Sequence, residues 1–444
     1  MSSRRIVLVG LLILASPLGA QTMDLTMPGR TVERATAGAD TSQTFAVYYP
    51  FAYSTNARWP LLFVMDPRGR AMLALRLFAP AAERHGFVVV SSYNTLSDGP
   101  VEPNLDAANA MLVAAETMIA ADMSRIYIAG FSGTARIAWA FELEEPKVFA
   151  GILSASAAPI LNDSAGSLAL ARTPGFAIAL TTGTTDFNAA EVRRAHAWLR
   201  SQQIPVREEE YIGPHNWPPT QVIEHTLAWF KLRGILDGRW PMDSAWLKQR
   251  LRDEAKRADS LATAGRILDA AEQYDQLDAL VGARSNGATI HARARELAEN
   301  AAVIGASKRL ADLDASFLDR KAETELYLAQ LRIKPKSREE IIRDLDINEL
   351  MKTAAESDSL EKQWAGRVLA LLQVSLGFYE PRAYLAQNRP LQAIAMLEVF
   401  AAIAPWSTGQ CEMYFEVLSR GMPDAQLRRV TAEAKPYAAS CRQR

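Results

Sequence analysis

The stretch Arg125–Arg136, RIYIAGFSGTAR, joins a short strand, a very tight turn and a helix. Ile126 and Ile128 alternate with their neighbours as they would in a buried strand, and an apolar-rich helical pattern follows the turn. Ser132 stands at the turn, with glycines two residues before it and one after it. Small neighbours are needed there because the backbone is cramped, and the first N–H groups of the next helix point at the serine. The stretch therefore predicts a nucleophilic serine between a strand and a helix.

The motif departs from the usual G-x-S-x-G, because Thr134 occupies the position of the last glycine. Short G-x-S patterns also occur by chance, so the motif gains weight only from partners elsewhere in the chain. A serine hydroxyl needs a base to take its proton and a carboxylate to orient that base.

His215 is the candidate base, since it lies in the loop sequence YIGPHNWPP directly after the last predicted strand. Asp186 is the candidate acid: a strand runs into a turn at Gly183, Asp186 follows, and a helix begins. An aspartate at that place is also a common helix N-cap. Asp163, in a polar loop, is the reserve candidate. The other four histidines fall in helical patterns or at a helix end, namely His85, His196, His225 and His291.

The composition fits a folded protein of two or three domains. The chain has 444 residues, of which 49% are hydrophobic and 22% charged. Its formal net charge of −1 becomes −3 when Arg4 and Arg5 are removed with the amino-terminal segment described next. We therefore expect no nucleic-acid partner, because there is no basic excess. Two cysteines and five scattered histidines predict no metal site, and no cofactor is expected.

The first residues have the pattern of a secretory signal. Two arginines precede an apolar run at 6–15, and small residues end at Ala20, which predicts a signal peptide over residues 1–20. A membrane anchor is the alternative, but the run is about half of the roughly twenty residues that cross a bilayer. We expect a periplasmic or secreted protein with no membrane span after cleavage. In that compartment Cys411 and Cys441 are expected to form a disulfide, with two free thiols as the alternative.

Residues 31–237 alternate strand-like and helix-like segments, which predicts an α/β fold with a mostly parallel sheet covered by helices on both faces. Asn104 is expected to cap one of these helices. Residues 240–444 lose the strand pattern and predict an all-α domain. Two segments in it have the spacing of tetratricopeptide helix pairs, one around Ala270 and one around Ala393, although a generic helical bundle fits as well.

The order Ser132, Asp186, His215 is that of α/β-hydrolases, and residues from about 31 to 236 resemble that superfamily. The similarity is to compact esterases related to polyhydroxybutyrate depolymerase, enterochelin esterase and dienelactone hydrolase. It is carried by GFSGTAR, GTTDFN, GPHNWP and PLLFVMDPRGR. The resemblance implies that Ser132 is acylated by an ester, that His215 shuttles the proton and that Asp186 holds the histidine.

The resemblance also implies an oxyanion hole built from two backbone N–H groups. Gly133 is expected to supply one. The second loop reads Asp66-Pro67-Arg68-Gly69 where many relatives have His-Gly, and proline has no N–H to donate. Arg68 is therefore the expected second donor.

We expect a serine hydrolase that acts on a small-molecule or polymeric carboxylic ester. One alternative is a decayed hydrolase domain that serves as a scaffold and binds a protein partner through its helical region. The other is a serine peptidase of the prolyl-oligopeptidase type, which has the same order of the three residues.

Overall fold

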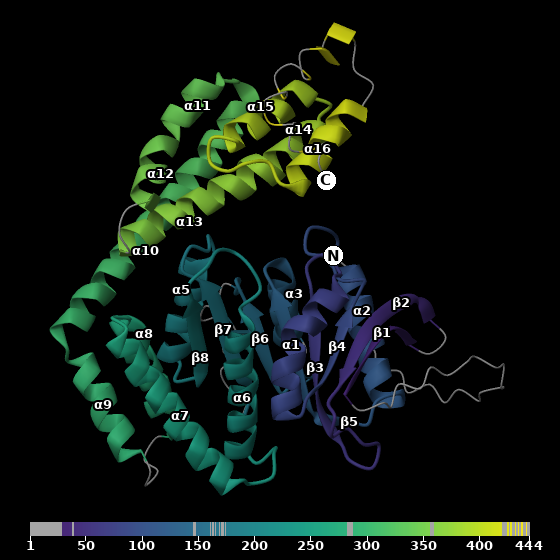
Figure 1. The fold of residues 1–444 in the computed structure, drawn as a ribbon, viewed down its shortest axis with the longest axis vertical. Coiled ribbons are helices and arrows are strands. Elements are labelled where there is room, and N and C mark those ends of the chain that lie inside the picture. Colours follow the sequence, from purple (N-terminus) through teal and green to yellow (C-terminus); the bar gives the residue numbers. More distant parts are fainter. Residues whose placement is uncertain are drawn as a thin grey trace.

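The computed structural model describes residues 29–37, 40–144, 148–159, 175–281, 287–355 and 359–419, with scattered residues at 161–173 and 424–441. A sheet flanked by helices forms one part of the molecule, and an arc of helices forms the other (Figure 1). The expected signal peptide and the reserve acid Asp163 lie outside the described residues.

The sheet has eight strands in the order β1-β2-β4-β3-β5-β6-β7-β8. The hairpin of β1 and β2 is antiparallel, β2 pairs antiparallel with β4, and every later pair is parallel. This order and these directions are those of the α/β-hydrolase fold, so the expected fold class is observed. The strands are β1 Arg30–Ala37, β2 Asp40–Tyr49, β3 Trp59–Met65, β4 Val88–Ser92, β5 Ala121–Phe131, β6 Gly151–Ala155, β7 Ala177–Gly183 and β8 Val206–Tyr211.

Helices cover both faces of the sheet because successive strand residues point to opposite faces. Leu61 and Phe63 of β3 lie in one apolar cluster, and Leu62 and Val64 lie in the other. The first cluster is closed by α2 Glu102–Thr117, α3 Gly133–Glu144 and α5 Ala189–Ser201. The second is closed by α1 Ala71–His85 and α6 Thr220–Leu236.

Asn104 does not cap its helix, contrary to the sequence expectation. The helix α2 begins at Glu102, and Asn104 lies inside it. Its side chain is completely buried, accepts a hydrogen bond from the Leu96 N–H at 2.9 Å and donates one to the Leu96 carbonyl at 2.8 Å. A side-chain amide can bond the backbone N–H and the carbonyl of one residue at once. Asn104 therefore fixes the loop at 94–100 and does not cap the helix.

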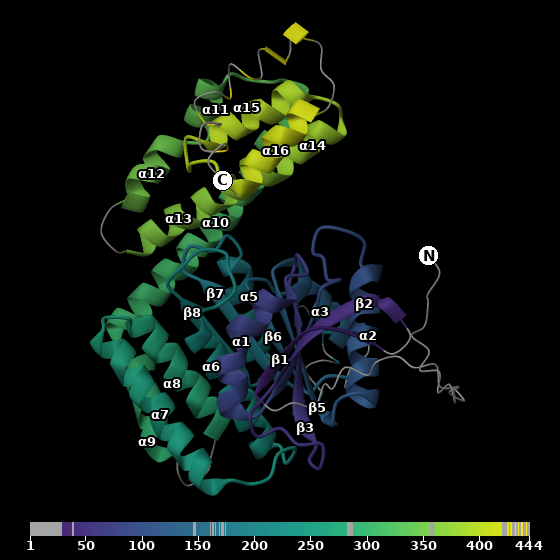
Figure 2. The same cartoon turned by 45° about the vertical axis from the view of Figure 1, so that its right-hand side comes forward.

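The second half of the chain contains only helices within its described residues. They are α7 Ser244–Thr263, α8 Ile267–Val281, α9 Ala288–Ala298, α10 Ala301–Ile333, α11 Arg338–Asp344, α12 Ile347–Ala355, α13 Leu360–Val374, the π-helical turn η1 Ser375–Tyr379, α14 Glu380–Ala386, α15 Pro390–Phe400 and α16 Thr408–Ser419. A separate apolar cluster lies among α10 to α16. Figure 2 shows α7 to α9 beside the sheet, and α11, α12 and α14 to α16 beyond one end of it. The tetratricopeptide-like arrangement stays a prediction.

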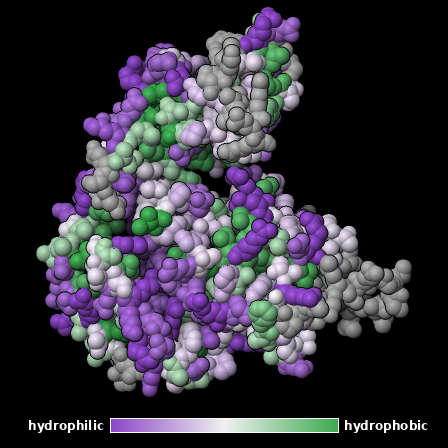
Figure 3. Space-filling view, viewed as in Figure 1, coloured by the Kyte–Doolittle hydropathy of each residue, from purple (hydrophilic) through white to green (hydrophobic). Residues whose placement is uncertain are grey.

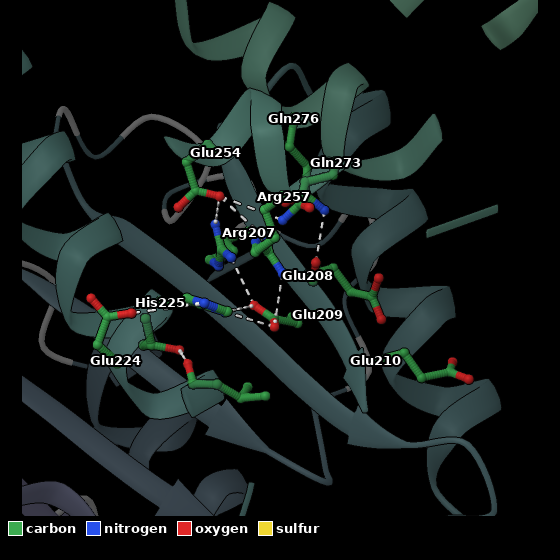
Figure 4. Close-up of polar contacts among 12 residues, drawn as sticks. Arg207, Glu208, Glu209, Glu210, Glu224, His225, Glu254, Arg257, Gln273 and Gln276 are labelled. Atoms are coloured by element: carbon green, nitrogen blue, oxygen red, sulfur yellow. Dashed lines mark hydrogen bonds and ion pairs between the residues drawn. The ribbon is translucent and has the colours of Figure 1, made fainter. Parts of the chain in front are cut away.

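The edge strand β8 is covered by α7 and α8 through buried charges rather than an apolar face. Its sequence is VREEEY, and Arg207 is buried between Glu209 and Glu254 (Figure 4). Gln276 of α8 donates to the Glu208 carbonyl at 2.9 Å. Burial raises the pKa of the Glu208 carboxyl. Covering an edge strand prevents it from pairing with another chain. Because buried charges need defined partners, these ion pairs favour one position of α7 and α8 on β8.

Cys411 and Cys441 are joined by a disulfide, which ties α16 to the carboxyl-terminal end of the chain. None of the described helices is long and apolar enough to cross a bilayer.

Candidate active site

Ser132 lies between the last residue of β5 and the first residue of α3 and has a φ of 57°. A side chain other than glycine is strained in this region, so the surrounding structure must hold it there. Gly130 makes the turn possible, because a Cβ atom at that position would lie 2.5 Å from the Thr134 carbonyl oxygen and 2.6 Å from the Ala135 backbone. The strained turn raises the serine hydroxyl above the end of the sheet.

Gly133 is required for a different reason. A Cβ atom there would lie 2.6 Å from the Cβ atom of Ser97, in the loop that Asn104 fixes. Gly133 also begins α3, where the first N–H groups of a helix have no carbonyl partner within the helix. Its position next to Ser132 fits the predicted oxyanion donor.

The structure brings Ser132, His215 and Asp186 together in one hydrogen-bonded line. The Ser132 Oγ lies 2.9 Å from the His215 Nε2, and the His215 Nδ1 lies 2.9 Å from the Asp186 Oδ1. The histidine side chain is 18% exposed and the aspartate is completely buried. A neutral imidazole in this arrangement carries its proton on Nδ1 and can accept the serine proton at Nε2.

Asp186 also accepts the Asn188 N–H at 2.8 Å, through the same Oδ1 that faces His215. The sequence left open whether the aspartate orients the histidine or caps α5. The N-cap position of α5 is Asn188 and not Asp186. The aspartate therefore does not cap the helix; the same oxygen atom that faces His215 accepts the N–H of Asn188, in the turn ahead of it. The other, Oδ2, is buried and has no hydrogen-bond partner among the described residues.

Two aromatic rings hold the imidazole that the sequence singled out. The Phe131 ring centroid lies 4.8 Å from that of His215, and the Phe187 centroid lies 4.3 Å from it. Both phenylalanines are chain neighbours of the other two residues of the line, Ser132 and Asp186. Their role was not predicted, because a phenylalanine beside a catalytic residue is more often simply part of the core.

The remaining four histidines each face a carboxylate instead of a serine. His85 and His225 lie 2.9 Å from Glu224 and Glu209, respectively (Figure 4 shows the second). The other two pairs are His196 with Glu272 and His291 with Asp278. These contacts belong to the cover of the sheet and to the helical half, so they leave His215 as the base candidate.

The Arg68 N–H is not free to bind an oxyanion in this structure, contrary to expectation. It donates to the Asp66 Oδ1 at 2.9 Å. The sequence showed that Pro67 lacks a donor but gave no sign that the Asp66 side chain folds back onto the following amide. Short aspartate side chains commonly bond the backbone two residues on.

Asp66 is completely buried and collects the polar groups of the loop after β3. It accepts hydrogen bonds from Arg68 N–H, from the Arg70 backbone and guanidinium, and from the Trp217 indole at 2.9 Å. Burial alone would raise its pKa, but the hydrogen bonds from Arg70 and Trp217 outweigh burial and hold the pKa below its ordinary value. Because Trp217 is two residues from His215, Asp66 joins the expected oxyanion loop to the histidine loop.

Thr134 fills the place of the missing glycine with a bonded side chain. Its hydroxyl is completely buried, donates to the Met65 carbonyl at 2.5 Å and accepts the Phe131 N–H at 3.1 Å. The side chain thus links the start of α3 to the ends of β3 and β5. The departure from the glycine motif adds a hydrogen-bonded link beside Ser132.

We expect Thr134→Val to lower the free energy of unfolding by about 1–3 kcal/mol, because it keeps the shape and removes the buried hydroxyl that bonds the Met65 carbonyl and the Phe131 N–H. Urea unfolding of the variant measures this loss. Thr117→Val is the control, since the Thr117 hydroxyl also donates to a backbone carbonyl but is exposed. Equal losses for the two variants would contradict the assigned role of Thr134.

The loops beside Ser132 lie near the helical half of the molecule. The surface is hollowed between the two parts (Figure 3). Tyr379 of η1 is about half exposed. Its pKa is raised, chiefly by the burial of the other half and also by the negative charge of Asp98 in the 94–100 loop. The pKa of Arg382 is lowered, chiefly by burial and also by the positive charge of Arg68. The loops beside Ser132 therefore face charged and aromatic side chains of the helical half.

Among the described residues, no group of three or more His, Cys, Asp or Glu side chains is placed to hold a metal ion. The chemistry available at the site is that of a nucleophilic hydroxyl, an imidazole and a carboxylate.

No protein-family model matches the chain, and no curated protein matches it. Several solved structures are similar to its first half. The S-formylglutathione hydrolase of Staphylococcus aureus is 15% identical, with 46% of this chain and 97% of that chain covered and a TM-score of 0.37. The fluorophosphonate-binding serine hydrolase F of Staphylococcus aureus is 16% identical, with 46% and 98% covered and a TM-score of 0.37. A feruloyl esterase module from Clostridium thermocellum is 14% identical, with 46% and 88% covered and a TM-score of 0.38.

The fold can be assigned from this chain alone. It has the strand order described above, a strained serine between β5 and α3, and the hydrogen-bonded line of three residues. The sheet-bearing part of this protein has the α/β-hydrolase fold.

Proposed function

We propose that this protein is a serine hydrolase that cleaves carboxylic esters through an acyl-enzyme on Ser132. The observation that carries the proposal is the continuous line from Ser132 Oγ through His215 to the buried Asp186, with 2.9 Å at both steps. Such a line has a defined use in catalysis: it moves a proton away from a hydroxyl while that hydroxyl attacks a carbonyl carbon.

In the acylation step, the Ser132 Oγ bonds to the ester carbonyl carbon while its proton passes to the His215 Nε2. Asp186 keeps the imidazole in the required tautomer and stabilises the imidazolium. The carbonyl oxygen becomes an oxyanion, which the Gly133 N–H is placed to bind. When the oxyanion collapses, the bond to the leaving alkoxide breaks and the alkoxide takes the proton from His215.

Deacylation repeats these steps with water as the nucleophile. His215 takes a proton from the water, the resulting hydroxide attacks the acyl carbon, and the Ser132 Oγ leaves with the proton. The products are a carboxylic acid and an alcohol. We also propose a periplasmic or secreted location, which the signal-like sequence of residues 1–20 supports.

A fluorophosphonate probe and short p-nitrophenyl esters test the proposal. We expect the purified protein to release p-nitrophenolate and to be labelled at Ser132, because an activated hydroxyl attacks both phosphorus and carbonyl centres. Mass spectrometry of the labelled peptide identifies the residue. A protein that is folded, unlabelled and inactive on every ester would favour the scaffold alternative. Labelling with cleavage of peptide p-nitroanilides and not of esters would favour the peptidase alternative.

A further inference from the structure

We propose that helices α10 and α13 hold the acid loop, residues 184–188, in the position that completes the line from Ser132 to Asp186. The helical half would then be a positioning part of the active site and not a separate module. The inference rests on the proposed function for its catalytic meaning. Figure 1 and Figure 2 both show α10 and α13 passing beside the end of the sheet at β7 and α5, where this loop lies.

The first contact is between α13 and Thr185. A Cβ atom on Gly366 would lie 2.7 Å from the Thr185 Cγ2 and 3.1 Å from its Cβ, so α13 approaches this side chain as closely as a glycine allows. On its other side Thr185 is bonded to the histidine loop. Its hydroxyl donates to the Gly213 carbonyl at 3.0 Å, and its N–H donates to the same oxygen at 3.0 Å. Gly213 lies two residues before His215.

The second contact is through Phe187. Its ring stacks against the His215 imidazole with centroids 4.3 Å apart, and it also packs against the apolar cluster of the helical half. Ala190, at the start of α5, is buried in that same cluster. Thr185 therefore contacts both α13 and the histidine loop, and Phe187 packs on His215 and on the apolar cluster that joins α5 to the helical half.

The third contact is an ion-pair network just beyond the loop. Arg193 of α5 pairs with Asp314 of α10 and with Glu210 of β8. Asp314 also accepts from Arg367 of α13 at 2.8 Å, and the Arg367 side chain is almost completely buried. Because Arg367 directly follows Gly366, this network fixes α13 at the point where it meets Thr185.

These contacts make the position of α13 a condition for the position of Asp186. A larger residue at Gly366 can be accommodated in two ways. The helix moves away and takes the Phe187 packing with it, or Thr185 turns and gives up its bond to Gly213. A displacement of about 1 Å in a catalytic group can lower the rate about a hundredfold.

The test is Gly366→Ala in the full chain, with Gly305→Ala as its matched control. Both glycines lie within helices, so alanine improves helix propensity equally at each. A Cβ atom at Gly305 meets nothing within 4 Å, whereas at Gly366 it meets Thr185. We expect Gly366→Ala to lower kcat on p-nitrophenyl esters about tenfold or more with KM changed much less, because the displaced carboxylate of Asp186 orients His215 for proton transfer. Gly305→Ala should turn over at the wild-type rate.

Thr185→Ser gives the rescue. It removes the Cγ2 atom that the new methyl group meets and keeps the hydroxyl that donates to Gly213. The double variant Gly366→Ala with Thr185→Ser should regain most of the kcat of Thr185→Ser alone, because only the contact of 3.1 Å with the Cβ atom of residue 185 is left. Asp314→Asn is a second way to displace α13. It weakens the ion pairs with Arg193 and Arg367 without adding volume, so it too should lower kcat much more than KM.

An NMR readout separates failure of this inference from failure of the proposed function. The proton that His215 Nδ1 donates to Asp186 gives a far-downfield signal that does not depend on any substrate. We expect the signal to be broadened or lost in Gly366→Ala and kept in Gly305→Ala. A folded Gly366→Ala variant that keeps both the signal and the wild-type kcat would overturn the inference. A wild type that keeps the signal, is unlabelled and is inactive would overturn only the proposed function.

Discussion

Ser132→Ala is expected to remove fluorophosphonate labelling and to lower kcat on p-nitrophenyl esters about a millionfold, toward the small rate that binding and the oxyanion donor alone provide. The methyl group fits without strain beyond that already present, because the φ of 57° belongs to the turn and not to the hydroxyl. The fold should therefore be unchanged. Steady-state kinetics with thermal unfolding of the same preparation measure both.

Ser156→Ala is the matched control for that variant. Ser156 is also buried, has a φ of 58° and lies just beyond the end of the next strand, but its hydroxyl faces the Asn216 carbonyl and not His215. It should remain labelled at Ser132. If the two alanine variants were labelled equally, Ser132 would not be the nucleophile.

Asp186→Asn tests the same line from its other end. The amide oxygen can still accept from Asn188, so the loop keeps its backbone geometry. The imidazole loses the negative charge that stabilises its protonated form, and kcat should fall about ten-thousandfold. A fall of less than tenfold would show that the aspartate holds its own turn through Asn188 and does not orient the histidine.

Asp66→Ala is expected to cost about 3–5 kcal/mol of the free energy of unfolding, near the lower end because the Arg70 side chain is partly exposed. The carboxylate is completely buried, and its removal leaves the Trp217 indole and the loop amides without an acceptor. Urea unfolding at neutral pH measures the loss. Asp122→Ala is the control, because Asp122 also bonds an arginine and a backbone amide but is about one-quarter exposed. We expect it to lose less than about 1 kcal/mol.

The Asp66 effect should depend on pH in a defined direction. The folded protein holds the pKa of Asp66 below its ordinary value, so its stabilisation is fully present above the unfolded pKa of about 4. That stabilisation is lost as the pH falls through the lower, folded value. The stability difference between wild type and Asp66→Ala should therefore shrink below about pH 4. A difference that stayed constant there would mean that the charge of Asp66 is not what stabilises the loop.

The residues of the candidate site could be predicted because each is marked by local chemistry. A serine between two glycines, an aspartate after a strand and turn, and a histidine in a proline-rich loop each follow a strand. The carboxyl ends of parallel strands meet at one edge of a sheet, so such residues can converge. Thr134 shows the limit of this reasoning: its hydroxyl reaches the Met65 carbonyl, in a strand far away in the chain.

Two predictions failed because an asparagine or aspartate side chain could bond to either of two backbone groups. The sequence favoured Asn104 as a helix cap and the Arg68 N–H as a free donor. The structure instead bonds Asn104 to Leu96 and the Arg68 N–H to Asp66. Asparagine and aspartate form short hydrogen bonds with whichever backbone group is nearest, and only the fold decides which group that is.

The sequence by itself determined the α/β alternation, the helical second half and the three residues of the hydrogen-bonded line, because hydrophobic periodicity and turn residues are local properties. Only the tertiary structure decided that Asp66 joins the histidine loop through Trp217 and that α13 meets the acid loop at Gly366. Those contacts join segments far apart in the chain, and their geometry follows from the packing of all the elements between them.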